Sequence, residues 1–241
     1  MAYNNGPTIV TNGLVLSLDA ADRNSYPGSG TTWRDMSGRG NNGTLTGGPP
    51  TFNSDNGGNI VFNGSSDYVN CGNISPTILS NNQFTFIFWF NMKGSARGDL
   101  LSIKNFNSPQ DDIGFFIDTN NKLCAYFSVQ GVTTSNVGIL ASVSNTTFSR
   151  NTIYNIACIK DESQKIVMYV NGILDNNTYS TTTNTANVAI TPVWLGSNKN
   201  NDTVTSNAWN GNIYSSQTYN RALSAAEILQ NYNALKSRFG L

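Results

Sequence analysis

The sequence predicts an all-β fold: one antiparallel two-sheet jelly-roll sandwich with a short C-terminal helix. Three observations predict it. Short apolar segments with strand periodicity recur along the chain, turn-forming pairs such as Asn171-Gly172 separate them, and helical periodicity is confined to one late segment. Many short strands at such spacing are typical of sandwiches and jelly rolls. We expect an N-terminal arm over residues 1–12 and a single domain over residues 13–241.

The segment Phe84–Phe90 is the strongest strand signal. Four phenylalanines at alternate positions fall on one face, while Ile87 and Trp89 fall on the other. Because successive side chains of a strand point to opposite faces, this strand is expected to be central and buried on both sides. Further strands are expected at 14–18, 60–62, 100–103, 114–118, 122–129, 154–160, 165–170, 193–195 and 213–219. The Ser/Thr/Asn-rich segments 141–152 and 175–187 are expected to be loops or edge strands of the sandwich.

One helix is expected, at about residues 225–237. Ser224 and Glu227 have the spacing of a capping box, in which each side chain binds a backbone N–H of the other. Apolar residues then recur on one face, from Ile228 to Leu235, so the helix is expected to pack on the sandwich. A docking role for the tail 238–241 is the alternative.

Charge is scarce in this chain, at 12% of residues against about 25% in ordinary proteins. The formal net charge is zero, so a basic face for nucleic acid or for an anionic membrane is not expected.

The first residues lack the basic and apolar regions of a signal peptide, and no apolar run approaches the roughly 20 residues of a membrane span.

Side chains suited to acid–base catalysis are few. The chain has no histidine, which removes His-activated nucleophiles, and its two glutamates, Glu162 and Glu227, fall in a turn and a helix cap. We therefore expect no enzyme activity. The alternative is a glycoside-active enzyme that uses Asp111 or Asp112, although neighbouring strand residues point to opposite faces.

Three cysteines, Cys71, Cys124 and Cys158, lie in or beside apolar runs and are interpreted as small buried hydrophobes.

Ordered motifs from Gly13 to Arg238 resemble the LamG-like jelly-roll family of the concanavalin A-like lectin/glucanase superfamily. The motifs are Gly13–Ala20, Trp33–Gly43 with its Asp-Met-Ser-Gly-Arg-Gly-Asn loop, Phe62–Val69, Phe84–Phe90, Met168–Gly172, Trp194–Ser197, Trp209–Ile213 and Tyr219–Ile228. The resemblance implies a concanavalin A/laminin G-like fold, with Phe62–Val69 and Met168–Gly172 as hairpins.

The resemblance extends to virion proteins of tailed bacteriophages, which implies the first functional expectation. It is a non-enzymatic capsid decoration or other particle component, located in the virion and acting through contacts with capsid or tail proteins and with copies of itself. The alternative is a lectin-like module of a tail fibre or baseplate that binds host-surface glycans. The fold alone does not decide between them, because it serves many functions.

Two sets of site residues are expected. Laminin-G domains often bind calcium at one rim, and the resemblance implies Asp112 and Asp202 as ligands, with Asn207 as a substitute for the second. Asn41, Asn42, Tyr68 and Trp209 are candidates for a sugar site, since aromatic rings stack on sugars and amides hydrogen-bond their hydroxyls. For the calcium residues the alternative is that they are solvated loop acids. For the sugar-site residues the alternative is a structural role in turns or in the core.

Overall fold

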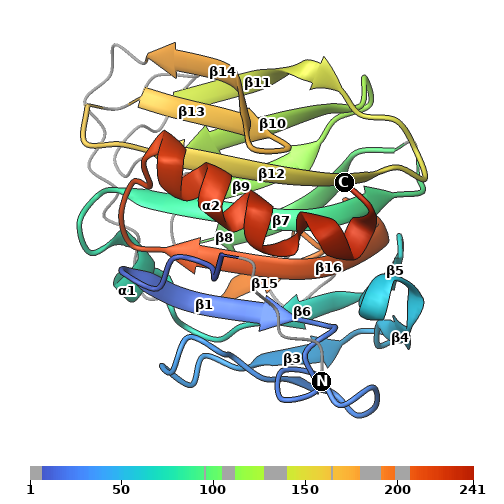
Figure 1. The fold of residues 1–241 in the computed structure, drawn as a ribbon. Helices are drawn as coiled ribbons and strands as arrows, with labels where there is room; N and C mark the ends of the chain where they lie inside the picture. Colours follow the sequence, from blue (N-terminus) through green and yellow to red (C-terminus); the bar gives the residue numbers. More distant parts are fainter. Residues whose placement is uncertain are drawn as a thin grey trace.

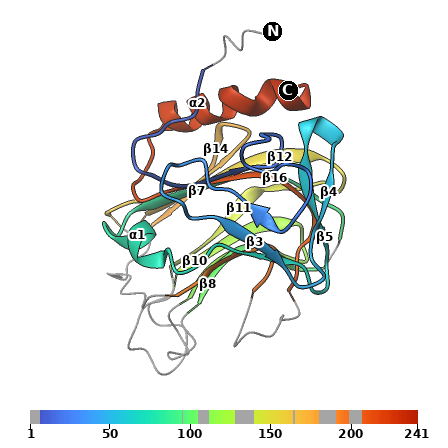
Figure 2. The same ribbon diagram turned by 90° about the horizontal axis from the view of Figure 1, so that it is seen from below.

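Two antiparallel sheets stacked face to face form the body of the protein, and a helix lies across the outer face of one of them (Figure 1, Figure 2). This computed structural model describes residues 7–94, 96–104, 112–127, 140–163, 165–179, 191–198 and 207–241. The expected two-sheet antiparallel sandwich with one C-terminal helix is confirmed.

The sheet beneath the helix is called sheet A, and its order is β14-β13-β12-β7-β16-β5-β4. The strand β1 pairs with the second half of β16, so that β16 joins both to β5 and to β1. The strands are β1 (Leu14–Asp19), β4 (Thr51–Asn53), β5 (Asn59–Asn63), β7 (Phe84–Met92), β12 (Ile153–Lys160), β13 (Lys165–Val170), β14 (Ile173–Tyr179) and β16 (Asn210–Tyr219).

The second sheet, sheet B, has the order β11-β10-β9-β8-β15-β6-β3-β2. Its strands are β2 (Thr32–Trp33), β3 (Gly43–Thr46), β6 (Tyr68–Asn70), β8 (Gly98–Lys104), β9 (Asp112–Ile117), β10 (Lys122–Phe127), β11 (Leu140–Thr147) and β15 (Val193–Leu195). Short helices add to the sandwich: η1 (Asp55–Gly57), α1 (Ser75–Leu79), α2 (Ala225–Leu235) and η2 (Lys236–Phe239).

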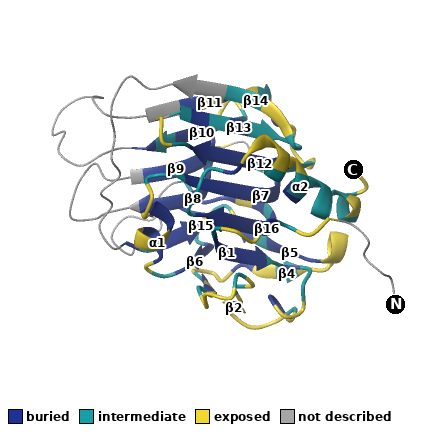
Figure 3. Ribbon diagram, turned by 60° about the vertical axis from the view of Figure 1, so that its left-hand side comes forward, coloured by how far each residue is buried: buried dark blue, intermediate teal, exposed yellow. Residues whose placement is uncertain are grey.

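The core lies between the two sheets, where the strands are buried along most of their length (Figure 3). The phenylalanines of β7 form its centre: Phe84 packs edge-on against Phe127 of sheet B, and Phe86 contacts Phe115. All nine residues of β7 are buried, so this strand is covered on both faces, as its two apolar faces predict.

Turn chemistry agrees with the sequence at the hairpins. Asn171 and Gly172 both have positive φ, at 50° and 75°, as a type I′ turn between β13 and β14 requires. The polar segments around 141–152 and 175–187 contribute the edge strands β11 and β14. Asp175 of β14 joins the two strands: its carboxylate accepts hydrogen bonds from the backbone N–H groups of Asn145 and Thr146 in β11, at 2.7 and 3.0 Å.

One expected hairpin is wrong. The segment Phe62–Val69 does not fold back on itself, because β5 belongs to sheet A and β6 to sheet B. The Asp67 carboxylate instead closes a corner between the sheets, accepting from the backbone N–H of Asn63 at 2.9 Å and from its side-chain amide at 2.9 Å. An Asn-Gly pair followed by polar residues is compatible with a corner as well as with a hairpin.

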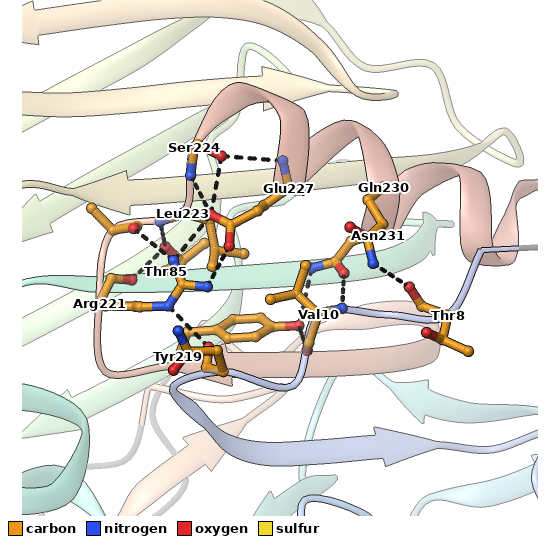
Figure 4. Close-up of polar contacts among 12 residues, drawn as sticks. Thr8, Val10, Thr85, Tyr219, Arg221, Leu223, Ser224, Glu227, Gln230 and Asn231 are labelled. Atoms are coloured by element: carbon orange, nitrogen blue, oxygen red, sulfur yellow. Dashed lines mark hydrogen bonds and ion pairs between the residues drawn. The ribbon is translucent and has the colours of Figure 1, made fainter.

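The helix α2 begins with the expected capping box (Figure 4). Ser224 accepts from the backbone N–H of Glu227 at 3.3 Å, and Glu227 accepts from the backbone N–H of Ser224 at 2.9 Å. The same carboxylate pairs with Arg221, whose Nη1 donates to Oε2 at 3.0 Å. These bonds, led by the one from Arg221, lower the pKa of Glu227 to about 2.

The segment before β1 runs under α2 and is tied to it by a closed set of buried hydrogen bonds (Figure 4). Val10 N–H donates to Asn231 Oδ1 at 2.7 Å, Asn231 donates to the Tyr219 hydroxyl at 3.0 Å, and that hydroxyl donates to the Val10 carbonyl at 2.9 Å. Helix, sheet and N-terminal segment are thus joined at one point, and each polar group there is satisfied.

The end of the chain clamps the far end of the helix to sheet A. Trp89 stacks on Phe239 with ring centroids 4.4 Å apart and on Tyr232 at 5.6 Å. Arg238 pairs with Asp19 at 2.7 Å and donates to the carbonyls of Asn56 and Gly58. The tail therefore closes the outer layer over β7.

We predict that Glu227→Gln lowers stability in a pH-dependent way. Because the pKa of Glu227 is lowered on folding, its charge stabilises the fold above about pH 4.5, and this stabilisation is lost as pH falls towards 2. The wild type should exceed the variant by about 1 kcal/mol in unfolding free energy at pH 7, and the difference should vanish near pH 2. Urea unfolding across this range measures it.

Glu162→Gln is the matched control. Its carboxylate is exposed, and among the described residues its hydrogen-bond partner is the Gln83 side chain at 3.4 Å. The role given to the Glu227 charge would be contradicted if the loss of unfolding free energy in Glu227→Gln did not change with pH. It would also be contradicted if Glu227→Gln and Glu162→Gln lost the same unfolding free energy.

Candidate functional site

A cavity of about 270 Å³ opens where the β5–β6 corner, the β7–β8 connection and the start of β16 meet. We call it the rim cavity. Its lining residues are Gly64, Met92, Gly94, Ala96, Arg97, Gly98, Ile117, Ala208, Trp209 and Asn210. Backbone bonds hold the three segments together: Gly64 N–H donates to the Trp209 carbonyl and Gly94 N–H to the Asn210 carbonyl.

Arg97 is the charged residue of this lining. Its guanidinium carbon lies 3.6 Å from the centroid of the Phe116 ring, and its Nη2 pairs with Asp99 Oδ1 at 3.1 Å. Asp99 is fully buried while the Arg97 side chain is 34% exposed, so the arginine is held by a buried carboxylate and by stacking over the Phe116 ring. Pairing and stacking of this kind leave a guanidinium pre-organised for hydrogen bonding.

Polar groups remain available in the cavity. Among the described residues, neither Arg97 Nη1 nor the side-chain amide of Asn210 has a hydrogen-bond partner, and Asn210 is exposed. Apolar walls come from Met92, Ile117 and the edge of Trp209. A guanidinium, an amide and an apolar wall around a small cavity are the groups that bind a polyhydroxylated ring.

Small residues allow this arrangement. A Cβ on Gly98 would lie 2.9 Å from the Trp209 ring, and one on Gly94 would lie 2.8 Å from the Asn210 Cβ. Both contacts are closer than carbon atoms tolerate, so the loops approach the start of β16 only with glycine at these positions.

Of the four residues expected at a sugar site, Trp209 lines the rim cavity. Its ring is 2% exposed and packs edge-on against Phe90 at 5.5 Å, so it presents an edge rather than a face. Tyr68 lies in β6 and is 7% exposed. A stacking role for these two rings stays a prediction.

Asn41 and Asn42 lie in a loop that covers the free edge of β1. The centre of this loop is the Asp35 carboxylate, which accepts from the backbone N–H groups of Ser17 and Asn41 at 2.9 Å each. The Asn41 amide donates to the Val15 carbonyl at 2.8 Å, and Asn42 Oδ1 accepts from Asp35 N–H at 2.9 Å. Both amides thus satisfy backbone groups that an edge strand would leave open, and their sugar role stays a prediction.

The expected calcium ligands stay predictions. Asp202 and the side chain of Asp112 lie outside the part of the chain that the structure describes, although Asp112 begins β9. Asn207 is described, and its carbonyl accepts from Asp99 N–H at 3.0 Å. Within the described ranges, no group of three or more His, Cys, Asp or Glu side chains could hold a metal ion.

The three cysteine thiols are poorly placed to act as nucleophiles. Cys71 and Cys158 are buried as expected, whereas Cys124 is half-buried, and all three thiols are free. Burial raises the pKa of Cys71 to about 12 and that of Cys124 to about 11, so neither is a ready thiolate at neutral pH. The alternative acids Asp111 and Asp112 cannot be placed, since neither side chain is among the described residues.

Sequence reasoning missed Arg97, Asp99 and Asn210. A signal was present, since Arg97 is one of only 14 basic residues and stands in a run of small residues, Gly-Ser-Ala-Arg-Gly. Charged residues within glycine-rich loops are candidates for binding, because loops on a rigid scaffold often carry function.

The two stacked sheets and the cavity at their rim define a lectin-like sandwich. The chain belongs to the family described as the concanavalin A-like lectin/glucanases superfamily, whose match covers residues 63–229. No curated protein matches the chain significantly.

Several solved structures share the fold. The CBM40 of the Ruminococcus gnavus IT-sialidase bound to alpha2,3 sialyllactose is similar at a TM-score of 0.53 and 18% identity, over 61% of this chain and 80% of that one. The binding domain of Paraclostridial Mosquitocidal Protein 1 has a TM-score of 0.69 and 14% identity, over 93% of this chain and 52% of that one. A Trypanosoma rangeli sialidase in complex with 2,3-difluoro-KDN has a TM-score of 0.67 and 16% identity, over 95% of this chain and 34% of that one.

These similarities show a shared fold and do not bear on a bacteriophage context. A virion location and virion partners therefore stay predictions. Among the described residues, no helix has the length and apolar character needed to span a bilayer.

We predict that Asp35→Ala destabilises the fold by about 2–3 kcal/mol, because it removes several hydrogen bonds to one half-buried carboxylate. Urea unfolding measures the loss. Asp55→Ala is the control, since the exposed Asp55 side chain hydrogen-bonds to none of the described residues. Equal stability of the two variants would show that the loop is not held by Asp35.

Proposed function

We propose that the protein is a non-catalytic carbohydrate-binding module that holds a sugar residue in the rim cavity. The observation that carries this proposal is Arg97, which is fixed by Asp99 and Phe116 and has Nη1 directed to no described protein group. A guanidinium held in this way donates to sugar oxygens without losing much side-chain freedom on binding.

The size of the cavity supports a small ligand. At about 270 Å³ it lies just below the range of roughly 300–1,000 Å³ for small-molecule pockets, which suits one sugar ring rather than a long oligosaccharide. The exposed Asn210 amide both donates and accepts, as hydroxyl recognition requires. The family and the sialyllactose-bound structural relative add support by similarity.

A binding rather than a catalytic role is supported by the carboxylates. Glycosidases flank the scissile bond with two carboxyl groups about 5–9.5 Å apart. Glu227 pairs with Arg221 at the helix cap, and Glu162 lies in the β12–β13 turn. Asp99, beside the cavity, is paired with Arg97, and the described residues show no second carboxylate in the cavity lining.

We predict that the wild type binds at least one glycan class on an array and that Asn210→Ala and Arg97→Lys weaken this binding about tenfold or more. Lysine keeps the charge above the buried Asp99, so the fold is preserved, but it loses the planar donor pair. A loss of one charge-assisted hydrogen bond corresponds to about 1.5–3 kcal/mol. Isothermal titration calorimetry with the best array ligand measures it.

Arg150→Ala is the control, because Arg150 is exposed in the turn before β12. The proposal fails if the wild type binds no glycan with or without calcium, or if Asn210→Ala and Arg97→Lys bind as tightly as Arg150→Ala.

A further inference from the structure

The outer face of sheet A changes character beneath α2. Under the first half of the helix it is apolar, where Ile87 and Tyr219 pack with Leu223 and Ile228. Under the second half it is divided: Trp89 of β7 stacks on Tyr232, whereas in the β1–β16 register Ser17 lies opposite Gln217 and Asp19 lies opposite Ser215. A helix that covers a sheet normally meets apolar side chains, so helix packing alone does not explain this polar block of β1 and β16.

Three side chains of this polar block, Ser17, Ser215 and Gln217, are buried and have no hydrogen-bond partner among the described residues. Gln217 is 2% exposed and Ser17 is 4% exposed. The Ser215 hydroxyl is fully enclosed, whereas Ser17 and Gln217 line a cavity. An unpaired buried polar group costs about 1–3 kcal/mol, and such groups are rare in native proteins. Their presence together points to a polar occupant.

A cavity of about 330 Å³ lies directly above Ser17 and Gln217. We call it the α2 cavity. Its lining residues are Pro7, Thr8, Ile9, Ser17, Asp19, Asp22, Met36, Gln217, Ala234 and Leu235. The lining thus combines the two unpartnered polar residues, several aliphatic residues and two acidic residues.

The charges of this lining are unequal. Asp19 is neutralised by Arg238, whose Nη1 lies 2.7 Å from its Oδ1. Asp22 accepts from the backbone N–H of Asn24 at 2.8 Å and has no ion-pair partner among the described residues. The α2 cavity therefore has one uncompensated negative charge, which favours a cation and disfavours an anion.

We propose that the α2 cavity binds the ammonium group of a primary alkylamine, either a free diamine or the lysine side chain of a partner protein. An ammonium has three N–H donors and no acceptor. Gln217 Oε1, Ser17 Oγ and the Asp22 carboxylate offer acceptors to the ammonium, and the aliphatic lining residues offer an apolar surface to the methylene chain. This site is distinct from the rim cavity and does not depend on sugar binding.

The test uses the full chain and two amines, diaminobutane and Nα-acetyl-lysine methylamide, in calorimetric titration and thermal unfolding. Butanediol, of similar length but uncharged, is the matched ligand control. We expect an amine to bind and to raise the melting temperature, while butanediol does neither. Tighter binding of diaminobutane identifies a free amine, and tighter binding of the lysine analogue identifies a partner's side chain.

Two variants test the assigned residues. Asp22→Asn and Gln217→Leu should each weaken amine binding about tenfold or more, and Gln217→Leu should keep or raise the melting temperature because it removes an unpartnered buried amide. Glu162→Gln, which removes a distant exposed charge, should bind as the wild type does. The proposal is overturned if no amine binds, if butanediol binds equally well, or if both site variants retain full affinity; the cavity then holds water only.

Discussion

The burial of β7 on both faces is the constraint on which the rest of the structure depends. Its phenylalanines need sheet B on one side, and Ile87 and Trp89 need a cover on the other. The helix α2 supplies that cover, yet eleven residues are too few for a stable isolated helix. Helix and sheet therefore stabilise each other, and the capping box, the Val10–Asn231 bonds and the Trp89–Phe239 stack fix their relative position.

The same constraint determines which parts of the molecule are free to bind ligands. The strands of both sheets are committed to packing. The groups that we propose to bind ligands therefore lie where loops meet, at the rim cavity, or where the helix extends past the apolar part of the sheet face, at the α2 cavity. Arg97 in the first and Gln217 in the second share one property: each is set in position by the scaffold while part of its hydrogen-bonding capacity is unused.

Much of the fold could be predicted from the sequence, because period-two apolar patterns and turn pairs are local. The strands around Phe84–Phe90, the Asn171-Gly172 turn and the Ser224–Glu227 cap are of this kind. The corner at Asp67 could not be predicted, since hairpin and corner share the same turn residues. The candidate site could not be predicted either. Arg97 is held in place by Asp99 and Phe116, and these two residues come together through the β8–β9 pairing. Ser17 and Gln217 look like solvent-facing strand positions until α2 covers them.

The position of β16 in sheet A has a consequence for how the chain acquires its structure. This strand lies between β7 on one side and β5 and β1 on the other, all of which precede it by more than a hundred residues. During synthesis those strands emerge without the neighbour that joins them. One edge of β7 stays unpaired until β16 is made, and one apolar face of β7 stays uncovered until α2 is made. Pairings of such long sequence separation slow folding. A nascent chain therefore exposes apolar surface and strand edges for longer than a chain whose central strands come first, which favours aggregation before folding is complete.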